Sequence, residues 1–171
     1  FMWGDNSNHQ LGLSGPTFVQ EPTLINAELN LQDSEHIVSM ALGNAHSILL
    51  TSFGNVIVFG ANAHGQLGLG STDSALTANT HTLDFLMPGD CVEQITTGRN
   101  HTGILTEKGL VYLFGSNARK QISLEDNLFY STPTRMVLQF EMAYGDAITK
   151  LVMGDSHNAV LTEFGEIIMW G

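Results

Sequence analysis

The stretch Phe59–Gly115 reads FGANAHGQLGLGSTDSALTANTHTLDFLMPGDCVEQITTGRNHTGILTEKGLVYLFG, and it begins and ends on the same aromatic–glycine pair. That pair also stands at residues 3–4 and 170–171, so it recurs every 55 or 56 residues along the whole chain. A fixed period of this size is typical of solenoids and propellers. The sequence therefore predicts three tandem repeats, over about residues 4–59, 60–114 and 115–170, that together form one domain.

Five landmarks recur at the same place in every copy. They are an opening glycine, an asparagine two residues later, a glutamine, the histidine of a G-x-x-H motif and the last glycine of an L-T-x-x-G motif. In chain order within each class, they are Gly4, Gly60 and Gly115; Asn6, Asn62 and Asn117; Gln10, Gln66 and Gln121; His46, His101 and His157; and Gly54, Gly109 and Gly165.

The clearest local pattern starts at the histidine. In the first copy, two strand-like runs at 46–51 and 55–59 are joined by a short connection that ends in Gly54, which predicts a β-hairpin with this glycine at positive φ. The other two copies repeat it. Because the runs are almost continuously apolar, we expect strands that are covered on both faces. We also expect a short strand at residues 23–25, and core positions for Trp3, Phe59, Phe114 and Trp170.

Composition limits the class of protein. The 171 residues contain no apolar run near the roughly 18 residues of a membrane span, no secretory signal pattern, and one cysteine, Cys91, that cannot form an internal disulfide. We therefore expect an intracellular protein, cytoplasmic or nuclear. Six Lys and Arg stand against 17 Asp and Glu, a formal charge of −11. This acidity disfavours direct binding to nucleic acid or to anionic membranes. It is compatible with simple solubility or with attraction to a basic protein.

No pattern in the chain indicates a reaction. The three repeated histidines could bind metal, but no Cys or carboxylate recurs beside them, so we expect structural histidines that bond to backbone. The triplet Asp155-Ser156-His157 is not maintained in the other copies, which argues against a catalytic triad. Residues 60–70 are glycine-rich, but Gln66 stands where a phosphate-binding loop needs lysine. We therefore predict no catalytic, cofactor or metal site, and no enzyme activity.

These motifs resemble the repeats of the regulator of chromosome condensation family, whose pattern runs W-G-x-N-x-x-G-Q-L-G-L-G and later G-x-x-H-T-x-A-L-T-x-x-G-x-V-Y-x-W-G. Residues 60–70 match the first half and residues 98–115 the second. The resemblance implies an all-β fold, with four-stranded antiparallel blades in a seven-bladed propeller. Three repeats would leave exposed sheet edges. The expectation is therefore a partial propeller of about three blades, a fragment whose neighbours are the remaining blades of the same chain.

The function predicted is a non-catalytic scaffold for protein–protein interaction, because function on such frames is carried by loops. The segments expected to present the contact surface are 26–32, 71–88 and 125–140. The resemblance leaves open a guanine-nucleotide exchange factor for a small GTPase, or the substrate-recruiting propeller of a ubiquitin ligase or kinase. The candidate partner contacts are large side chains that could instead pack on the outer edge of a blade: Phe85, Leu86, Met87, Phe129 and Tyr130.

Overall fold

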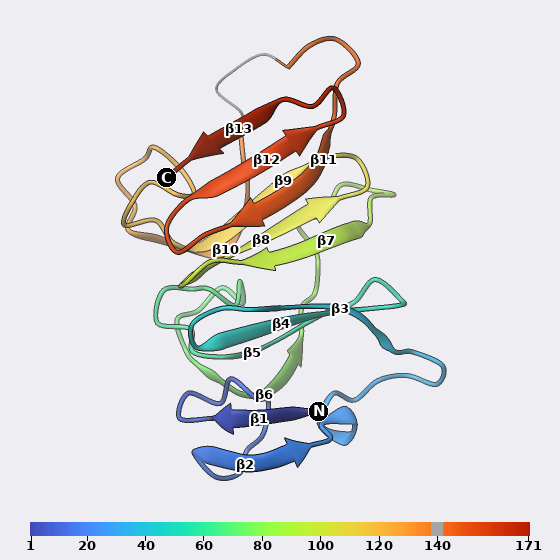
Figure 1. Ribbon diagram of the computed structural model, residues 1–171, viewed down its shortest axis with the longest axis vertical. Coiled ribbons are helices and arrows are strands. Elements are labelled where there is room, and N and C mark those ends of the chain that lie inside the picture. Colours follow the sequence, from blue (N-terminus) through green and yellow to red (C-terminus); the bar gives the residue numbers. More distant parts are fainter. Residues whose placement is uncertain (138–141) are drawn as a thin grey trace.

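A computed structural model describes residues 1–137 and 142–171, which form the all-β partial propeller that the repeats predict (Figure 1). Four antiparallel sheets are stacked one on another, with the two termini at opposite ends of the stack. We call them blades 1 to 4 in chain order. No helix within the described ranges has the length and hydropathy needed to cross a bilayer.

Blades 2 and 3 each have four strands, whereas blades 1 and 4 have two and three. A single 3-10 turn, η1 (Asn26–Glu28), follows blade 1. The strands of blade 1 are β1 (Met2–Asp5) and β2 (Phe18–Thr23); of blade 2, β3 (Ile37–Leu42), β4 (His46–Thr51), β5 (Val56–Gly60) and β6 (Ala75–Thr80); of blade 3, β7 (Val92–Thr97), β8 (His101–Thr106), β9 (Val111–Ser116) and β10 (Phe129–Arg135); of blade 4, β11 (Ile148–Met153), β12 (Asn158–Thr162) and β13 (Ile167–Trp170).

The blades are out of step with the sequence repeats. Strand β5 ends on the aromatic–glycine pair at 59–60, and β6, from the following repeat, pairs back onto β5 in the same sheet. The second repeat therefore supplies the outermost strand of blade 2 and the first three strands of blade 3. As a result, each repeat boundary lies inside a sheet, and consecutive repeats are tied together by strand pairing.

The three predicted hairpins are present, and their glycines have the expected conformation. Gly54, Gly109 and Gly165 adopt φ of 81°, 72° and 86°. The threonine of the L-T-x-x-G motif stabilises each turn, because its hydroxyl accepts a backbone N–H from the residue after the glycine, as from Asn55 to Thr51 (3.2 Å). The same bond, from residue 110 to 106 and from 166 to 162, measures 3.2 and 3.1 Å.

The apolar core lies between blades rather than beneath them. Every residue of β4, β5, β8 and β9 is buried, which confirms that these strands are covered on both faces. Side chains of blades 2 and 3 share one cluster that includes Ile48, Ile104 and Phe114, and those of blades 3 and 4 share another that includes Leu105 and Leu151. The two faces of blade 2, and likewise the two faces of blade 3, therefore contribute to two different cores.

Two sequence expectations differ from the structure. Phe59 and Phe114 are fully buried, but Trp3 is 60 % exposed, because its face of blade 1 points away from blade 2 and no sheet covers it here. The strand expected at 23–25 lies earlier, at Phe18–Thr23, and includes Pro22. An outermost strand pairs on one side only, so it tolerates a proline. The equivalent strand β10 likewise contains Pro133.

Candidate interaction surfaces

The repeated asparagines hold the loop that follows each aromatic–glycine pair. Asn62 is fully buried; its Oδ1 accepts the N–H of Leu67 (2.9 Å) and its Nδ2 donates to the carbonyls of Ser71 and Asp73 (3.0 and 2.9 Å). Asn6 and Asn117 make the same set of bonds in their own loops. These side chains are therefore used inside the frame and offer no free group to a ligand.

The repeated glutamines join these loops to the next blade. The Gln66 side chain accepts the N–H of His64 (2.9 Å), and its backbone carbonyl accepts the hydroxyl of Thr102 on β8 (2.7 Å). In the first copy the carbonyl of Gln10 accepts the Ser47 hydroxyl (2.6 Å). In the third, the carbonyl of Gln121 accepts from the amide of Asn158 (2.6 Å) and the indole of Trp170 (2.8 Å).

The repeated histidines connect neighbouring blades through side chains, so the expectation of backbone partners is wrong. His46 Nε2 lies 3.0 Å from Thr102 Oγ1, and His101 Nε2 lies 2.8 Å from Asn158 Oδ1. The Thr102 hydroxyl already donates to Gln66, so it accepts from His46, whose Nε2 therefore carries the proton. His157, at the uncovered face of blade 4, is exposed.

Burial holds both inner histidines in their neutral form. Desolvation, with a smaller contribution from neighbouring His101, lowers the pKa of His46 to about 4. Desolvation also lowers the pKa of His101, and the hydrogen bond that His101 makes to Asn158 Oδ1 opposes this shift. The Nδ1 atoms of both rings are buried without a hydrogen-bond partner. Among residues 1–137 and 142–171, no three His, Cys, Asp or Glu side chains are grouped to hold a metal ion.

The opening glycines are required by close backbone contacts. Gly60 and Gly115 both have φ of 105°, and a Cβ on either would lie 2.6 Å from a carbonyl oxygen, of Ala45 and Asn100 respectively. Gly4 has nearly the same φ, 106°, but faces open space. The glycine that begins each G-x-x-H motif is covered by the ring of its own histidine, as Gly98 is by His101.

One further repeated position was not recognised from the sequence. Asp90 Oδ1 accepts the N–H of Cys91 (3.0 Å) and of Lys108 in the neighbouring hairpin turn (3.3 Å). Asp146 makes the corresponding bonds to the N–H groups of Ala147 and Phe164 (2.9 and 3.1 Å). Glu35 occupies this position in the first copy and accepts from the side chain of Asn55 (2.8 Å). A carboxylate two residues before each innermost strand was the available signal.

The predicted partner contacts divide into two groups. Phe85, Leu86 and Tyr130 are half-buried and pack against the interblade cores. Met87 and Phe129 are 48 % and 43 % exposed. Residues 138–140 of the third contact segment lie outside the described residues. The structure therefore leaves two accessible candidates: Met87, in the connection after β6, and Phe129, at the start of β10 in the next blade.

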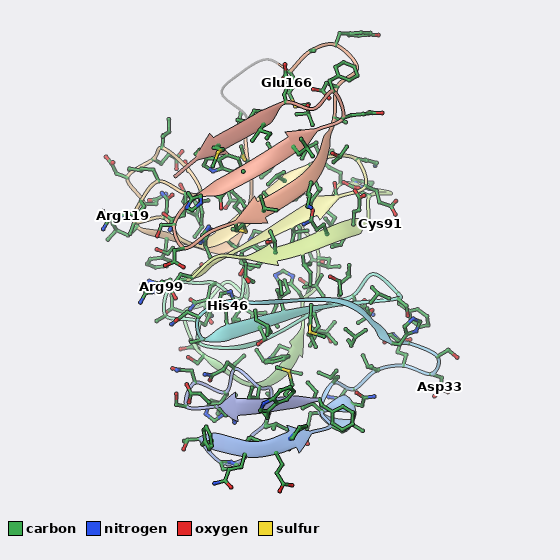
Figure 2. All side chains as sticks on the ribbon, viewed as in Figure 1. Asp33, His46, Cys91, Arg99, Arg119 and Glu166 are labelled. Carbon is green, nitrogen blue, oxygen red and sulfur yellow. The ribbon has the colours of Figure 1, made fainter. Side chains whose placement is uncertain are left out.

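Figure 2 shows the two rims of the stack, whose side chains differ in charge. One rim carries the G-x-x-H turns and the loops after the aromatic–glycine pairs, including Arg99 and Arg119 on the left of the view; the other carries the hairpin turns, with Asp33 on the right. On the turn rim, five carboxylates (Asp5, Asp73, Glu125, Asp126 and Asp155) are accompanied by three cations (Arg99, Arg119 and Lys120). The described part of the hairpin rim has two cations, Lys108 and Arg135, and nine carboxylates: Glu28, Asp33, Glu35, Asp84, Asp90, Glu107, Asp146, Glu163 and Glu166.

A hollow of about 490 Å³ lies on the hairpin rim between blades 3 and 4, and two others lie elsewhere on the described part of the stack. A polar groove of about 300 Å³ runs across the three G-x-x-H turns and includes Asn44, Arg99 and Asp155. A cavity of about 290 Å³ opens on the outer side, where blades 2 and 3 meet, between the connection after β6 and strand β10. Neither contains the arrangement of nucleophile, base and oxyanion donors that group-transfer chemistry needs. Both are surfaces suited to binding.

The sequence matches two family models of the Regulator of chromosome condensation (RCC1) repeat. The first covers residues 1–50 and 54–105, and the second covers residues 37–66. The first match alone extends over more than half of the chain. Both include the asparagine, glutamine and histidine positions that build the blade junctions described above.

Two curated relatives illustrate the similarity. The chain is 31 % identical to the mouse protein "Secretion-regulating guanine nucleotide exchange factor", over all of this chain and 35 % of the relative. It is 37 % identical to the human "X-linked retinitis pigmentosa GTPase regulator", over 78 % of this chain and 12 % of the relative. The chain thus spans about a third or less of the length of these relatives.

A solved structure has the same fold. The structure described as "Crystal structure of Kap60 bound to yeast RCC1 (Prp20)" aligns with a TM-score of 0.81 and 27 % identity, over 99 % of this chain and 39 % of the solved chain. Nearly the whole of the present chain therefore superposes on part of a known structure.

Proposed function

Because this chain belongs to the regulator of chromosome condensation (RCC1) repeat family, we propose that it is a non-catalytic scaffold whose loops bind a protein partner. The observation that supports this role is how the polar side chains are used. The repeated Asn, Gln and His side chains in the interior bond within the frame. The connection after β6 and the start of the outermost strand β10 instead present exposed side chains, Met87 and Phe129. A rigid frame with variable loops favours binding over chemistry.

The charge of the hairpin rim indicates what kind of protein partner is favoured. The hairpin rim has nine carboxylates, one lysine and one arginine among its described residues, so a basic protein surface would be attracted and oriented by it. Three of these carboxylates, Glu35, Asp90 and Asp146, also hold hairpin turns. The remaining six are available for long-range attraction.

The test compares loop variants in the full-length protein. Met87→Asp and Phe129→Asp place a charge at the two accessible candidates. Phe18→Asp, at a 59 % exposed position of β2 that corresponds to Phe129 and lies outside the contact segments and the hairpin rim, is the matched control. We expect the full-length protein to bind a protein partner directly. The dissociation constant of that complex, measured by titration calorimetry, should rise at least about tenfold for Met87→Asp or Phe129→Asp, since buried interface anchors contribute roughly 2 kcal/mol or more. Equal affinities for all three variants and wild type would contradict the proposal.

Guanine-nucleotide exchange is the second candidate, supported by the name of the mouse relative that aligns with the entire chain. The three copies have nearly uniform lengths, so the chain contains no large insertion within a blade that could act as a wedge on a GTPase. Nucleotide release from small GTPases, followed with a fluorescent GDP analogue, decides this. Release at the spontaneous rate with the full-length protein would eliminate exchange activity and leave the scaffold.

A further inference from the structure

The cavity on the outer side of blades 2 and 3 is formed by three segments that are distant in sequence. Leu69 comes from the loop before β6, His81 and Phe85 from the connection after β6, and Pro133 from β10 of the next blade. Its volume of about 290 Å³ is at the lower limit of small-molecule pockets, which favours a single inserted side chain over a whole cofactor.

The wall of the cavity is fixed by its own contacts. The centroid of the Phe85 ring lies 4.8 Å from that of the Tyr112 ring, and these rings are tilted against each other. It lies 5.5 Å from that of the His81 ring, and these two rings are edge to face. His81 Nδ1 accepts the N–H of Leu83 (3.2 Å), so its Nε2 donates to the carbonyl of Gly68 (2.9 Å). A wall that is already ordered loses little conformational entropy when a ligand binds.

This wall is not required by the repeat. The residue that follows the outermost strand is His81 in blade 2 and Met136 in blade 3, and both donate a backbone N–H to the neighbouring strand (2.7 and 2.8 Å). Only the histidine adds a side-chain bond that links the loop before β6 to the connection after it. The blade frame is therefore complete without this bond, which shapes the cavity instead.

The lining is apolar with one negative charge. Leu69, Phe85 and Pro133 supply apolar surface, and Asp84, which is exposed, is the only charged residue among the lining side chains. His81 stays neutral, because both of its nitrogens already have partners that fit the neutral ring. Arg135, two residues after Pro133, lines a different hollow, on the hairpin rim, and Lys108 donates to the Pro88 carbonyl at the other end of the connection (2.9 Å).

We propose that this cavity binds a partner segment in which a large apolar side chain lies next to Arg or Lys: the apolar side chain fills the space between Phe85 and Pro133, and the cation pairs with Asp84. The proposal rests on the scaffold function and assigns the chemistry of one contact. Charge complementarity selects this occupant, because the lining offers a carboxylate and no cation to an incoming segment.

The first test uses synthetic nine-residue peptides and the full-length protein. The peptides have a central leucine, methionine or phenylalanine flanked by arginines, and their counterparts carry glutamates in place of the arginines. We expect saturable binding of the arginine peptides by fluorescence anisotropy, at least tenfold weaker binding of the glutamate peptides, and weaker binding at high salt. Absence of saturable binding for all three arginine peptides would overturn the proposal.

Variants of the full-length protein test whether the arginine peptides bind in this cavity. Asp84→Asn should weaken the arginine peptides about fivefold, as loss of an exposed ion pair does, and Thr132→Trp, at an exposed position of the lining, should abolish binding by filling the cavity. Asp155→Asn removes the same charge on the opposite rim and should have no effect. Unchanged binding to both Asp84→Asn and Thr132→Trp would refute the site. If Phe129→Asp abolishes binding of the protein partner while Thr132→Trp does not, the cavity is refuted and the scaffold remains.

Discussion

The junction between blades 2 and 3 and the junction between blades 3 and 4 use the same positions with different side chains. At the first, His46 bonds to Thr102; at the second, His101 bonds to Asn158. The two junctions also differ in the size of the side chain at one equivalent position. Ile48 packs in the first core, whereas its counterpart Gly103 leaves space for side chains of β11. The repeat therefore conserves the polar connections and lets volume vary across each interface.

A further difference is a polar bridge that only the second junction has. The Gln94 amide donates to the carbonyl of Leu151 (2.7 Å) and accepts its N–H (3.0 Å), as a neighbouring strand would. Ser39 is at the same position of blade 2, and none of the described hydrogen bonds involves its hydroxyl. The second junction thus replaces part of its apolar contact with paired amides.

The largest expected effect comes from breaking the backbone contact of blade 3 next to the first junction. Gly115→Ala would place a Cβ 2.6 Å from the Asn100 carbonyl at φ of 105°, so we expect a loss of more than about 3 kcal/mol in unfolding free energy. Gly4→Ala has the same φ and open space, and should lose only about 1 kcal/mol. Thermal unfolding of the full-length protein measures both, and similar losses would show that backbone conformation alone, not the contact, requires glycine.

The second-largest expected effect is the loss of stability at the first junction when the pH is lowered. Because the pKa of His46 is about 4 in the folded protein and near 6.5 when unfolded, the unfolded state binds the proton first as pH falls. Stability from this group is complete above about pH 6.5 and is lost between there and pH 4, by up to about 3 kcal/mol. His46→Asn, which is uncharged, should flatten the profile of melting temperature against pH over this range. An unchanged profile would mean that other groups dominate.

Making the second junction resemble the first should have a moderate effect. Gly103→Ile introduces the side chain found at position 48, but its Cβ would lie 2.7 Å from Leu151 Cδ2 and 2.8 Å from Met153 Sδ. We expect a loss of about 1–3 kcal/mol from overpacking. Adding Leu151→Ala should recover part of this loss, because it vacates the space. If a double-mutant cycle shows no coupling between Gly103→Ile and Leu151→Ala, the two positions do not share one packing volume and the prediction is contradicted.

The smallest effect tests the amide bridge. Gln94→Ala removes two hydrogen bonds from a partly buried site and should lower the unfolding free energy by about 1–2 kcal/mol. Ser39→Ala, the matched change in blade 2, should alter it by less than about 0.5 kcal/mol. Urea unfolding of the full-length protein separates the two, and equal effects would remove this distinction between the junctions.

The candidate surfaces were only partly predictable. The sequence singled out Phe85, Leu86, Met87, Phe129 and Tyr130 because they lie in variable segments. Their position in the sequence does not tell which of these side chains are buried and which are exposed. Tyr130 packs because β10 lies beside the core of blades 3 and 4, whereas Phe129, one residue earlier, points to the other side of the same strand. Their role in partner binding stays a prediction.

By itself the sequence determined the backbone plan: the period, the hairpins, the positive φ at Gly54, Gly109 and Gly165, and strands with two apolar faces. These are local properties, because they follow from glycine conformation and from the pattern of side chains along one strand. Only the tertiary structure decided which groups meet across blades: the histidine on the next blade's side chain, the carboxylate beneath each hairpin turn, the exposure of Trp3, and the cavity beside His81. Those depend on what a distant repeat places opposite each residue, which no single stretch of the chain encodes.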